Sequence, residues 1–244
     1  AFAPPLPWML ALLSLITLLL TPPVTVMVIQ FSARGNRSLP IVSVPAEQAK
    51  EQPAYLLTVR LHNQRSLRSA EQRQAIEDAL AMAQEVCALY PGLAVAVQER
   101  GLALLISKAQ TDGLTAVYAS LLLQHLLREY ETLGEFRCHL CHVISPKDPA
   151  EITAMAVDAI EEITNLEQNL TLASLAKAET ALMTAEVFTD LDAEQREWAQ
   201  EFTHPILEDL APQEAFYSVE RLPEREQMLI TGQAQVVLGF NMAT

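Results

Sequence analysis

One short stretch of the sequence has the residue types and spacing of a cofactor site. Cys138, Cys141 and His142 form a CxxCH motif, the pattern of c-type haem attachment, in which two thiols and one histidine hold the same haem. Zinc also binds thiolates and imidazoles, and it would need a further ligand from elsewhere in the chain. The candidates for that ligand are Cys87, His62, His125 and His204. Both chemistries require the thiols of Cys138 and Cys141 to lie on the same side of the chain.

The residues around this motif have the pattern of a β-strand over 136–144. In a strand, residues three apart point to opposite faces, so Cys138 and Cys141 would neither hold one haem nor ligate one zinc ion. Free cysteine is also often buried as a small apolar residue. We therefore expect structural cysteines and no cofactor or metal, with a haem at Cys138, Cys141 and His142 as the alternative.

Five further elements precede this strand. Apolar runs and helical periodicity predict the order strand, helix, strand, strand, helix, strand, over residues 56–61, 69–90, 93–97, 102–106, 114–127 and 136–144. Gly101 supplies the turn of the hairpin. This βαββαβ order predicts an α+β, ferredoxin-like unit with both helices on one face of a sheet. We expect apolar residues such as Leu122 and Leu123 of the second helix to need cover from a second copy.

This unit and the residues after it resemble the catalytic domain of class III adenylate and guanylate cyclases, over residues 55–222. The family's first strand ends in a metal-binding Asp, and Asn63 stands in that place within residues 61–67. The family's hairpin carries the second metal-binding Asp, and Arg100 of the triplet Glu99-Arg100-Gly101 occupies its position. The resemblance implies a nucleotidyl-cyclase type fold in which neither metal carboxylate is present.

The resemblance also implies that a third catalytic group is missing. After the strand at 136–144, the family presents a helix with an Asn and, one turn later, an Arg that stabilises charge in the transition state. Residues 146–168 contain no Arg, and Thr153 and Val157 fall at those two positions. Residues 172–188 and 216–222 resemble the closing part of the family, and 223–244 form an unassigned C-terminal extension. We expect no enzymatic activity and no catalytic residues.

The N-terminal segment differs from the rest of the chain. Residues 1–33 carry no charge, and the run from Trp8 to Phe31 is almost entirely apolar, long enough for one transmembrane helix. A signal peptide is the alternative. Arg34 and Arg37 follow it, which predicts an inner-membrane protein with its C-terminal domain in the cytoplasm. Residues 34–54 contain three prolines and form a linker.

Composition limits the partners. The net charge is −14, and nucleic acids require a basic surface, so we expect no nucleic-acid partner. Three cysteines do not form a disulfide framework, which agrees with a reducing compartment.

Together these features predict a bacterial, membrane-anchored and catalytically inactive cyclase-like domain that regulates or signals, acting as a homodimer. A non-catalytic nucleotide-binding sensor is one alternative, and a c-type cytochrome is another. By its organisation the chain also resembles the C-terminal part of Smp-like membrane proteins of the haemolysin-regulator type.

Overall fold

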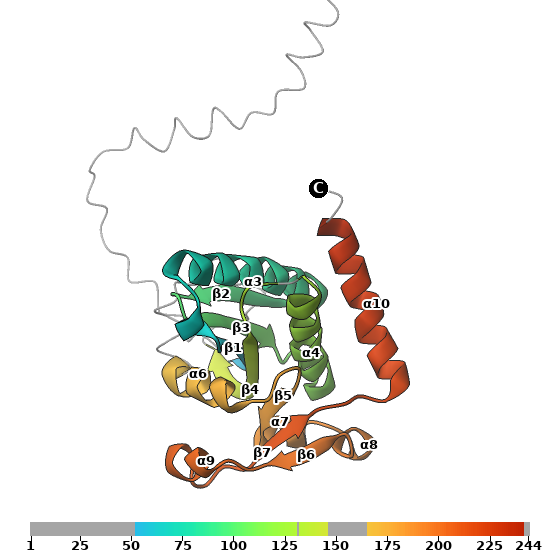
Figure 1. Ribbon diagram of the computed structural model, residues 1–244. Coiled ribbons are helices and arrows are strands. Elements are labelled where there is room, and N and C mark those ends of the chain that lie inside the picture. The colour runs from blue at the N-terminus through green and yellow to red at the C-terminus, as the bar shows by residue number, and fades with distance from the viewer. Residues whose placement is uncertain (1–51, 131, 146–164, 242–244) are drawn as a thin grey trace, which may run out of the picture. The chain divides into compact units, whose positions relative to one another are not determined.

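The computed structural model describes residues 52–130, 132–145 and 165–241. These residues contain a seven-stranded sheet of order β2-β3-β1-β4-β5-β7-β6 (Figure 1). All neighbouring strands are antiparallel except β4 and β5, which run parallel. The strands are β1 (Gln52–Leu61), β2 (Gly92–Val97), β3 (Gly101–Ser107), β4 (Phe136–Ser145), β5 (Ala181–Thr184), β6 (Ala199–Phe202) and β7 (Phe216–Val219).

The described helices differ widely in length. The three long helices are α3 (Ser69–Leu89), α4 (Gly113–Glu129) and α10 (Glu224–Asn241), and α10 is the last element of the described residues. The others are the 3-10 turn η1 (Gln64–Ser66), α6 (Leu166–Leu175), α7 (Ala185–Thr189), α8 (Ala193–Arg196) and α9 (Pro205–Leu210).

The first part of the chain follows the predicted βαββαβ order, as β1, α3, β2, β3, α4 and β4. Local chemistry explains where the helices begin. Glu71 accepts a 2.8 Å hydrogen bond from the backbone N–H of Arg68, the residue before α3. Asp112 precedes α4 and accepts a 2.8 Å hydrogen bond from the backbone N–H of Thr115. Each carboxylate satisfies an N–H group that has no partner within its helix.

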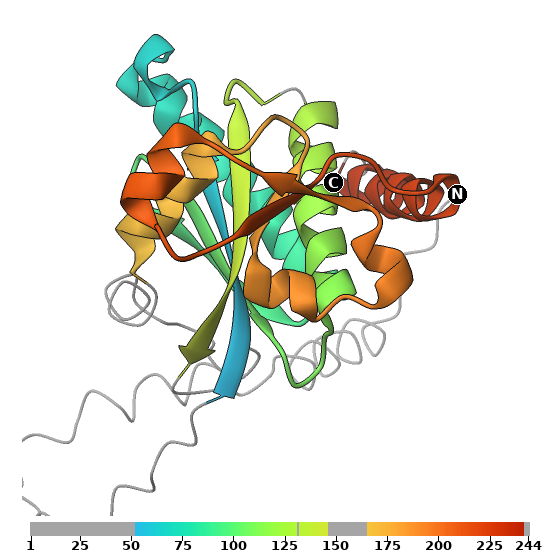
Figure 2. The ribbon, with the colours of Figure 1, turned by 90° about the horizontal axis from the view of Figure 1, so that it is seen from below.

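The two faces of the sheet carry different helices. On one face, Leu57, Val59 and Leu61 pack in a large core with residues of α3 and α4. On the other face, Leu56 packs against Leu170 of α6. Figure 2 shows α4 and α6 on opposite sides of the strands. The predicted placement of α3 and α4 on one face is therefore confirmed.

The apolar surplus of α4 is covered within the chain. Leu122 and Leu123 are fully buried and share a core with Ile230, Ala234 and Val237 of α10. The expectation that these leucines need a second copy is wrong, because α10 belongs to the unassigned extension and packs along α4. Periodicity within 114–127 could not show which segment would cover it.

Several predicted features lie outside the described residues, namely the transmembrane segment at 1–33, most of the linker at 34–54, and Thr153 and Val157. Across 52–130, 132–145 and 165–241, no helix combines the length and apolar character needed to cross a membrane.

Candidate functional site

Three arginines lie at one end of the central strands, where β1 ends and β3 and β4 begin. We call this region the arginine end. The register places Arg60 of β1 between Arg137 of β4 and Gly101 of β3. Arg100 directly precedes Gly101, and its carbonyl oxygen accepts a 2.9 Å hydrogen bond from the backbone N–H of Leu61. Directly opposed residues on paired strands have Cβ atoms about 5 Å apart. The three arginines therefore come from one small area of the sheet.

Gly101 makes this close approach possible. A Cβ atom at position 101 would lie 1.9 Å from the carbonyl oxygen of Val59, far inside any van der Waals contact. A residue with a side chain would push β3 away from β1. The glycine thus holds the tip of the hairpin, and with it Arg100, beside Arg60.

Arg60 and Arg137 lie on the face that carries α6. The hydroxyl of Thr58 donates a 3.2 Å hydrogen bond to the carbonyl oxygen of Asn169 in α6, and the thiol of Cys141 donates one of 3.3 Å to the Asn169 side chain. Thr58 and Cys141 therefore face α6. Residues an even number apart in a strand share a face, so Arg60 and Arg137 face the same way.

The described residues supply little negative charge to these arginines. Arg100 forms an ion pair with Glu167 in the first turn of α6, and no carboxylate of the described residues pairs with Arg60 or Arg137. The Nε atoms of Arg100 and Arg137 are buried without a hydrogen-bond partner. Burial, followed by the positive charge of Arg100, lowers the pKa of Arg60, and the charge of Glu167 opposes this only in part.

The Asn63 side chain makes different contacts from that of Arg100. Its side-chain oxygen accepts a 2.9 Å hydrogen bond from the backbone N–H of Glu135, and its nitrogen donates one of 3.2 Å to the carbonyl oxygen of Leu133. Both ends of the amide thus bind the segment that leads into β4. Asn63 therefore anchors this segment, whereas the Arg100 side chain reaches α6.

A second polar cluster lies at the opposite ends of the same central strands. We call this region the aspartate end. One oxygen of Asp190, the residue after α7, lies 2.7 Å from the Tyr55 hydroxyl, 2.7 Å from Lys108 Nζ and 2.7 Å from His142 Nε2. The three groups come from β1, the end of β3, and β4. Asp190 therefore ties α7 to three central strands.

The charges at the aspartate end compensate one another. Burial alone would raise the pKa of Asp190, but hydrogen bonds from Lys108 and Tyr55 and the charges of His142 and Lys108 outweigh it, so that the pKa is lowered. Burial, followed by the hydrogen bond to Asp190, raises the pKa of Tyr55. Asp190 is thus held as a carboxylate and Tyr55 as a phenol, which suits a structural latch.

The CxxCH residues are distributed over both faces of β4. Cys138 packs in the large core under α3 and α4, whereas Cys141 packs in the smaller cluster under α6. Burial raises the pKa of both thiols, and His142 belongs to the aspartate end. The predicted strand is confirmed, and its folded form does not present the two thiols to one group.

Histidine and cysteine side chains elsewhere do not gather around the motif. Within the described part of the chain, no three or more His, Cys, Asp or Glu side chains are arranged to hold a metal ion. Cys87 is half-buried on α3, and burial raises its pKa to about 12. His204 precedes α9 and accepts a 3.2 Å hydrogen bond from the backbone N–H of Ile206.

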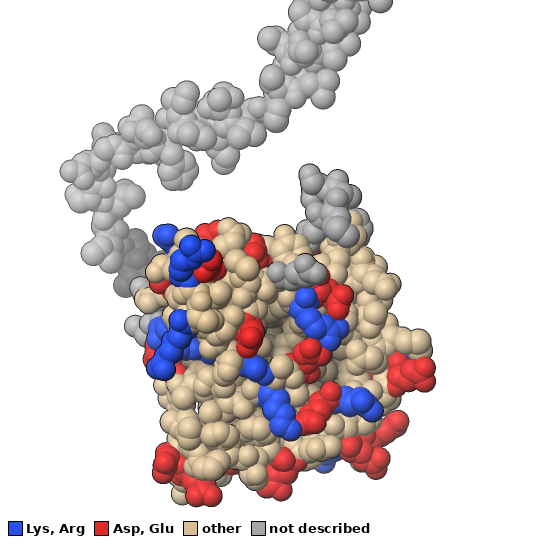
Figure 3. Space-filling model, in the orientation of Figure 1, with Lys and Arg blue, Asp and Glu red and all other residues tan. Residues whose placement is uncertain are grey.

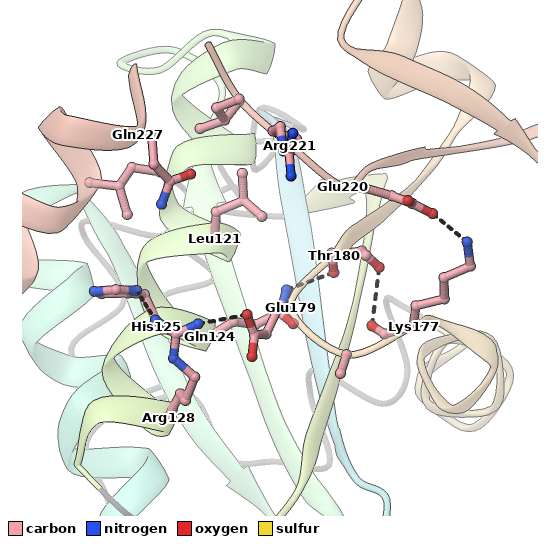
Figure 4. A pocket seen from close by; sticks show the side chains of 13 residues that line it. Leu121, Gln124, His125, Arg128, Lys177, Glu179, Thr180, Glu220, Arg221 and Gln227 are labelled. Carbon is pink, nitrogen blue, oxygen red and sulfur yellow. Dashed lines mark hydrogen bonds and ion pairs between the residues drawn. The ribbon is translucent and has the colours of Figure 1, made fainter. Parts of the chain in front are cut away.

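A cavity of about 410 Å³ lies between α4, the loop before β5, the segment after β7, and α10 (Figure 4). Its charges are largely paired, because Arg128 binds Glu179 at 2.6 Å and Lys177 binds Glu220. Gln124 donates a 2.6 Å hydrogen bond to the carbonyl oxygen of Thr180. The cavity could accept a small polar molecule.

Arg60 and Arg137 were not among the predicted site residues, although the sequence contains a signal for them. Each is a charged residue inside a strand that is otherwise largely apolar. A charge in a central strand needs a partner or a function. Their meeting depends on the register of β1 with β4, which sequence spacing does not give.

Comparison with known proteins shows which solved structures share this architecture. No protein-family model matches the chain, and no curated protein matches it. Solved structures do: the catalytic core of a rhodopsin-guanylyl cyclase in complex with ATPαS has a TM-score of 0.50 at 7% identity, over 70% of this chain and 97% of that one. The guanylyl cyclase Cya2 gives 0.49 at 13% identity, over 71% and 94%. The adenylyl cyclase CyaB from P. aeruginosa gives 0.46 at 11% identity, over 71% and 96%.

The likeness to the rhodopsin-guanylyl cyclase core shows that the described domain has a cyclase-like α+β fold. At these identities the likeness establishes the fold and nothing about activity. The predicted fold class is confirmed to that extent.

Proposed function

We propose that the chain is a membrane-anchored, catalytically inactive regulatory or signalling domain that acts as a homodimer. The observation that carries the proposal is Arg100. It occupies the hairpin position that matches a metal-binding aspartate in the cyclase resemblance, and it is a cation paired with Glu167. Divalent metals need anionic oxygen ligands. At about 4 Å and an effective dielectric of about 20, each unit of charge changes the interaction by about 4 kcal/mol, so this position repels a metal ion.

Helix α6 supports the same conclusion. It lies on the face of the arginine end, and its sequence contains no Arg or Lys. Helix α6 therefore supplies no Arg of the kind that stabilises charge in the family's transition state. A charge-stabilising donor of this kind typically contributes 10² to 10³ in rate.

A cyclase assay on the full chain tests the proposal. With ATP or GTP and Mg²⁺ or Mn²⁺, we expect no cyclic nucleotide above background. The double variant Asn63→Asp, Arg100→Asp should at most gain weak metal binding, because the charge-stabilising Arg is still missing. Formation of cyclic nucleotide by the unmodified chain would contradict the proposed regulatory function and show that the chain is an enzyme.

Homodimerisation is supported by the outer side of α10. Met228, Leu229 and Val236 are 63%, 46% and 56% exposed, although the helix is buried on its other side. Sedimentation velocity of the detergent-solubilised full chain at micromolar concentration should show a dimer, and Met228→Glu with Val236→Glu should shift it to monomer. A wild-type monomer at micromolar concentration would remove this part of the proposal.

Membrane anchoring is supported by the uncharged segment at 1–33 and by Arg34 and Arg37 after it. The full chain should sediment with membranes after a high-salt wash, and protease should reach the domain only from the cytoplasmic side. Release of the chain by salt would contradict an integral anchor.

A further inference from the structure

We propose that Arg60, Arg100 and Arg137 form a metal-independent binding site for a phosphoryl dianion at the arginine end of the sheet. The proposal rests on the proposed regulatory function, because it treats the arginine end as a binding site and not as an active site. It adds the ligand class and the residues that hold it.

The first argument is the placement of like charges. Arg60 and Arg137 are directly opposed across β1 and β4, and like charges in this arrangement destabilise a sheet. Arg100 is brought beside them by Gly101, which no residue with a side chain could replace without moving a strand. The fold thus gathers cations that do not stabilise one another, in a chain whose net charge is −14.

The second argument is unused hydrogen-bonding capacity. The buried Nε groups of Arg100 and Arg137 have no partner, whereas buried polar groups are nearly always hydrogen-bonded. The Arg100 side chain is 27% exposed, and Arg60 and Arg137 are half-buried, so solutes can reach them. The exposed parts of the guanidinium groups are therefore open to a solute, and the buried Nε groups keep hydrogen-bonding capacity that the protein does not use.

The third argument concerns the ligand. Among the described residues, Glu167 is the one carboxylate that pairs with any of the three guanidinium groups, through Arg100, which leaves two positive charges. Guanidinium forks match phosphate oxygens in pairs, and donors from two strands and a hairpin turn suit a tetrahedral group better than a planar carboxylate. Glu167 lies in the first turn of α6, where the positive end of the helix dipole also favours an anion.

Figure 3 shows acidic and basic side chains interspersed over one face of the domain, which is typical of a solvated surface. Arg60, Arg100 and Arg137 depart from that pattern, because only Arg100 pairs with a carboxylate of the described residues.

Calorimetry on the full chain tests the proposal, with inorganic phosphate, pyrophosphate, tripolyphosphate and ATP titrated in EDTA at low ionic strength. We expect binding without metal that weakens with added salt. ATP that binds no better than tripolyphosphate would identify a site for phosphoryl groups alone, and tighter ATP would identify a nucleotide. Either result supports the proposal.

Variants separate this site from general surface charge. Arg60→Met, Arg137→Met and Arg100→Lys should each weaken pyrophosphate binding by about 10-fold or more, since each removes a charge-assisted contact or its fork geometry. Glu167→Gln should tighten binding, because the competing carboxylate is gone. Arg65→Ala, an exposed arginine on η1, is the matched control and should bind as the wild type does. Thermal unfolding in phosphate-free buffer verifies that every variant is folded.

Three results would overturn the proposal: no binding at about 1 mM of any probe, binding only after Mg²⁺ is added, or an equal loss in Arg65→Ala and Arg60→Met. Binding only after Mg²⁺ is added would also contradict the repulsion of a metal ion at Arg100, whereas the other two results do not concern catalysis. Cyclic nucleotide formation would overturn the proposed function and leave metal-free binding intact, so the two failures are distinguishable.

Discussion

At the aspartate end of the sheet, Asp190 is in contact with Tyr55, Lys108 and His142. At the arginine end, Arg60 and Arg137 lie opposite each other on neighbouring strands, and no carboxylate of the described residues binds either of them. Both ends use the same central strands, β1, β3 and β4. The first arrangement satisfies its charges within the fold, and the second leaves donors unused. We infer that the first end contributes to stability and that the second is kept for a ligand.

The largest expected effect tests the stabilising end. Asp190→Ala removes the shared acceptor of three side chains and leaves the buried Tyr55 hydroxyl without a partner, so the free energy of unfolding should fall by about 2 to 4 kcal/mol. Urea unfolding of the full chain measures it. Asp209→Ala, an exposed aspartate on α9, is the control and should change stability by less than about 0.5 kcal/mol. An equal effect of the two variants would mean that Asp190 is no latch.

The second prediction concerns His139, which lies in β4 between the two ends. It is fully buried, neither ring nitrogen has a partner, and burial lowers its pKa to about 3. The unfolded chain takes up this proton near pH 6.5 and the folded chain does not. Stability should therefore be complete above about pH 6.5 and fall by about 1.4 kcal/mol per pH unit below it, which is about 2 kcal/mol at pH 5.

Unfolding of the full chain at pH 7 and pH 5 measures this loss. His139→Leu should remove most of the pH dependence, whereas His62→Gln, at an exposed position after β1, should keep it. If His139→Leu keeps the pH dependence of the free energy of unfolding seen in the wild type, the loss of stability arises from other groups. In that case the buried imidazole would not be the group that titrates.

The third prediction returns to the arginine end. In phosphate-free buffer at low salt, Arg60→Met should raise the free energy of unfolding by about 0.5 to 1 kcal/mol, because a repulsion across two strands is removed. Salt should reduce the gain, and urea unfolding at two ionic strengths measures both. A loss of more than about 1 kcal/mol would mean that packing of the Arg60 stem outweighs its charge.

Some of this structure was predictable from local patterns and some was not. The order from β1 to β4 follows from apolar periodicity, from Asp112 at the start of α4, and from Gly101 in the hairpin, all of which act over a few residues. The cover that α10 gives to Leu122 depends on packing between segments about 100 residues apart. No periodicity within either helix encodes that contact.

The candidate site divides in the same way. Arg100 was found because the cyclase resemblance places it at the hairpin position of the second metal-binding Asp. Its neighbours Arg60 and Arg137 are brought to it by strand register, and its partner Glu167 by the docking of α6. The resemblance likewise placed Asn63 at the first metal position, and in the structure its amide binds the segment at 133–135.

The last prediction compares the two cysteines of β4, the strand that joins the two ends, and the difference between them is expected to be small. The Cys141 thiol already donates to Asn169, and a serine hydroxyl can make the same contact, so Cys141→Ser should cost less than about 1 kcal/mol. Cys138 lies on the opposite face in the large apolar core, where a hydroxyl without a partner costs about 1 to 3 kcal/mol. Urea unfolding of both variants should therefore show Cys138→Ser as the more harmful. An absorbance spectrum of the wild type should show no haem band, and a haem band lost in both variants would mean that the two thiols reach one group and that β4 is not the strand described.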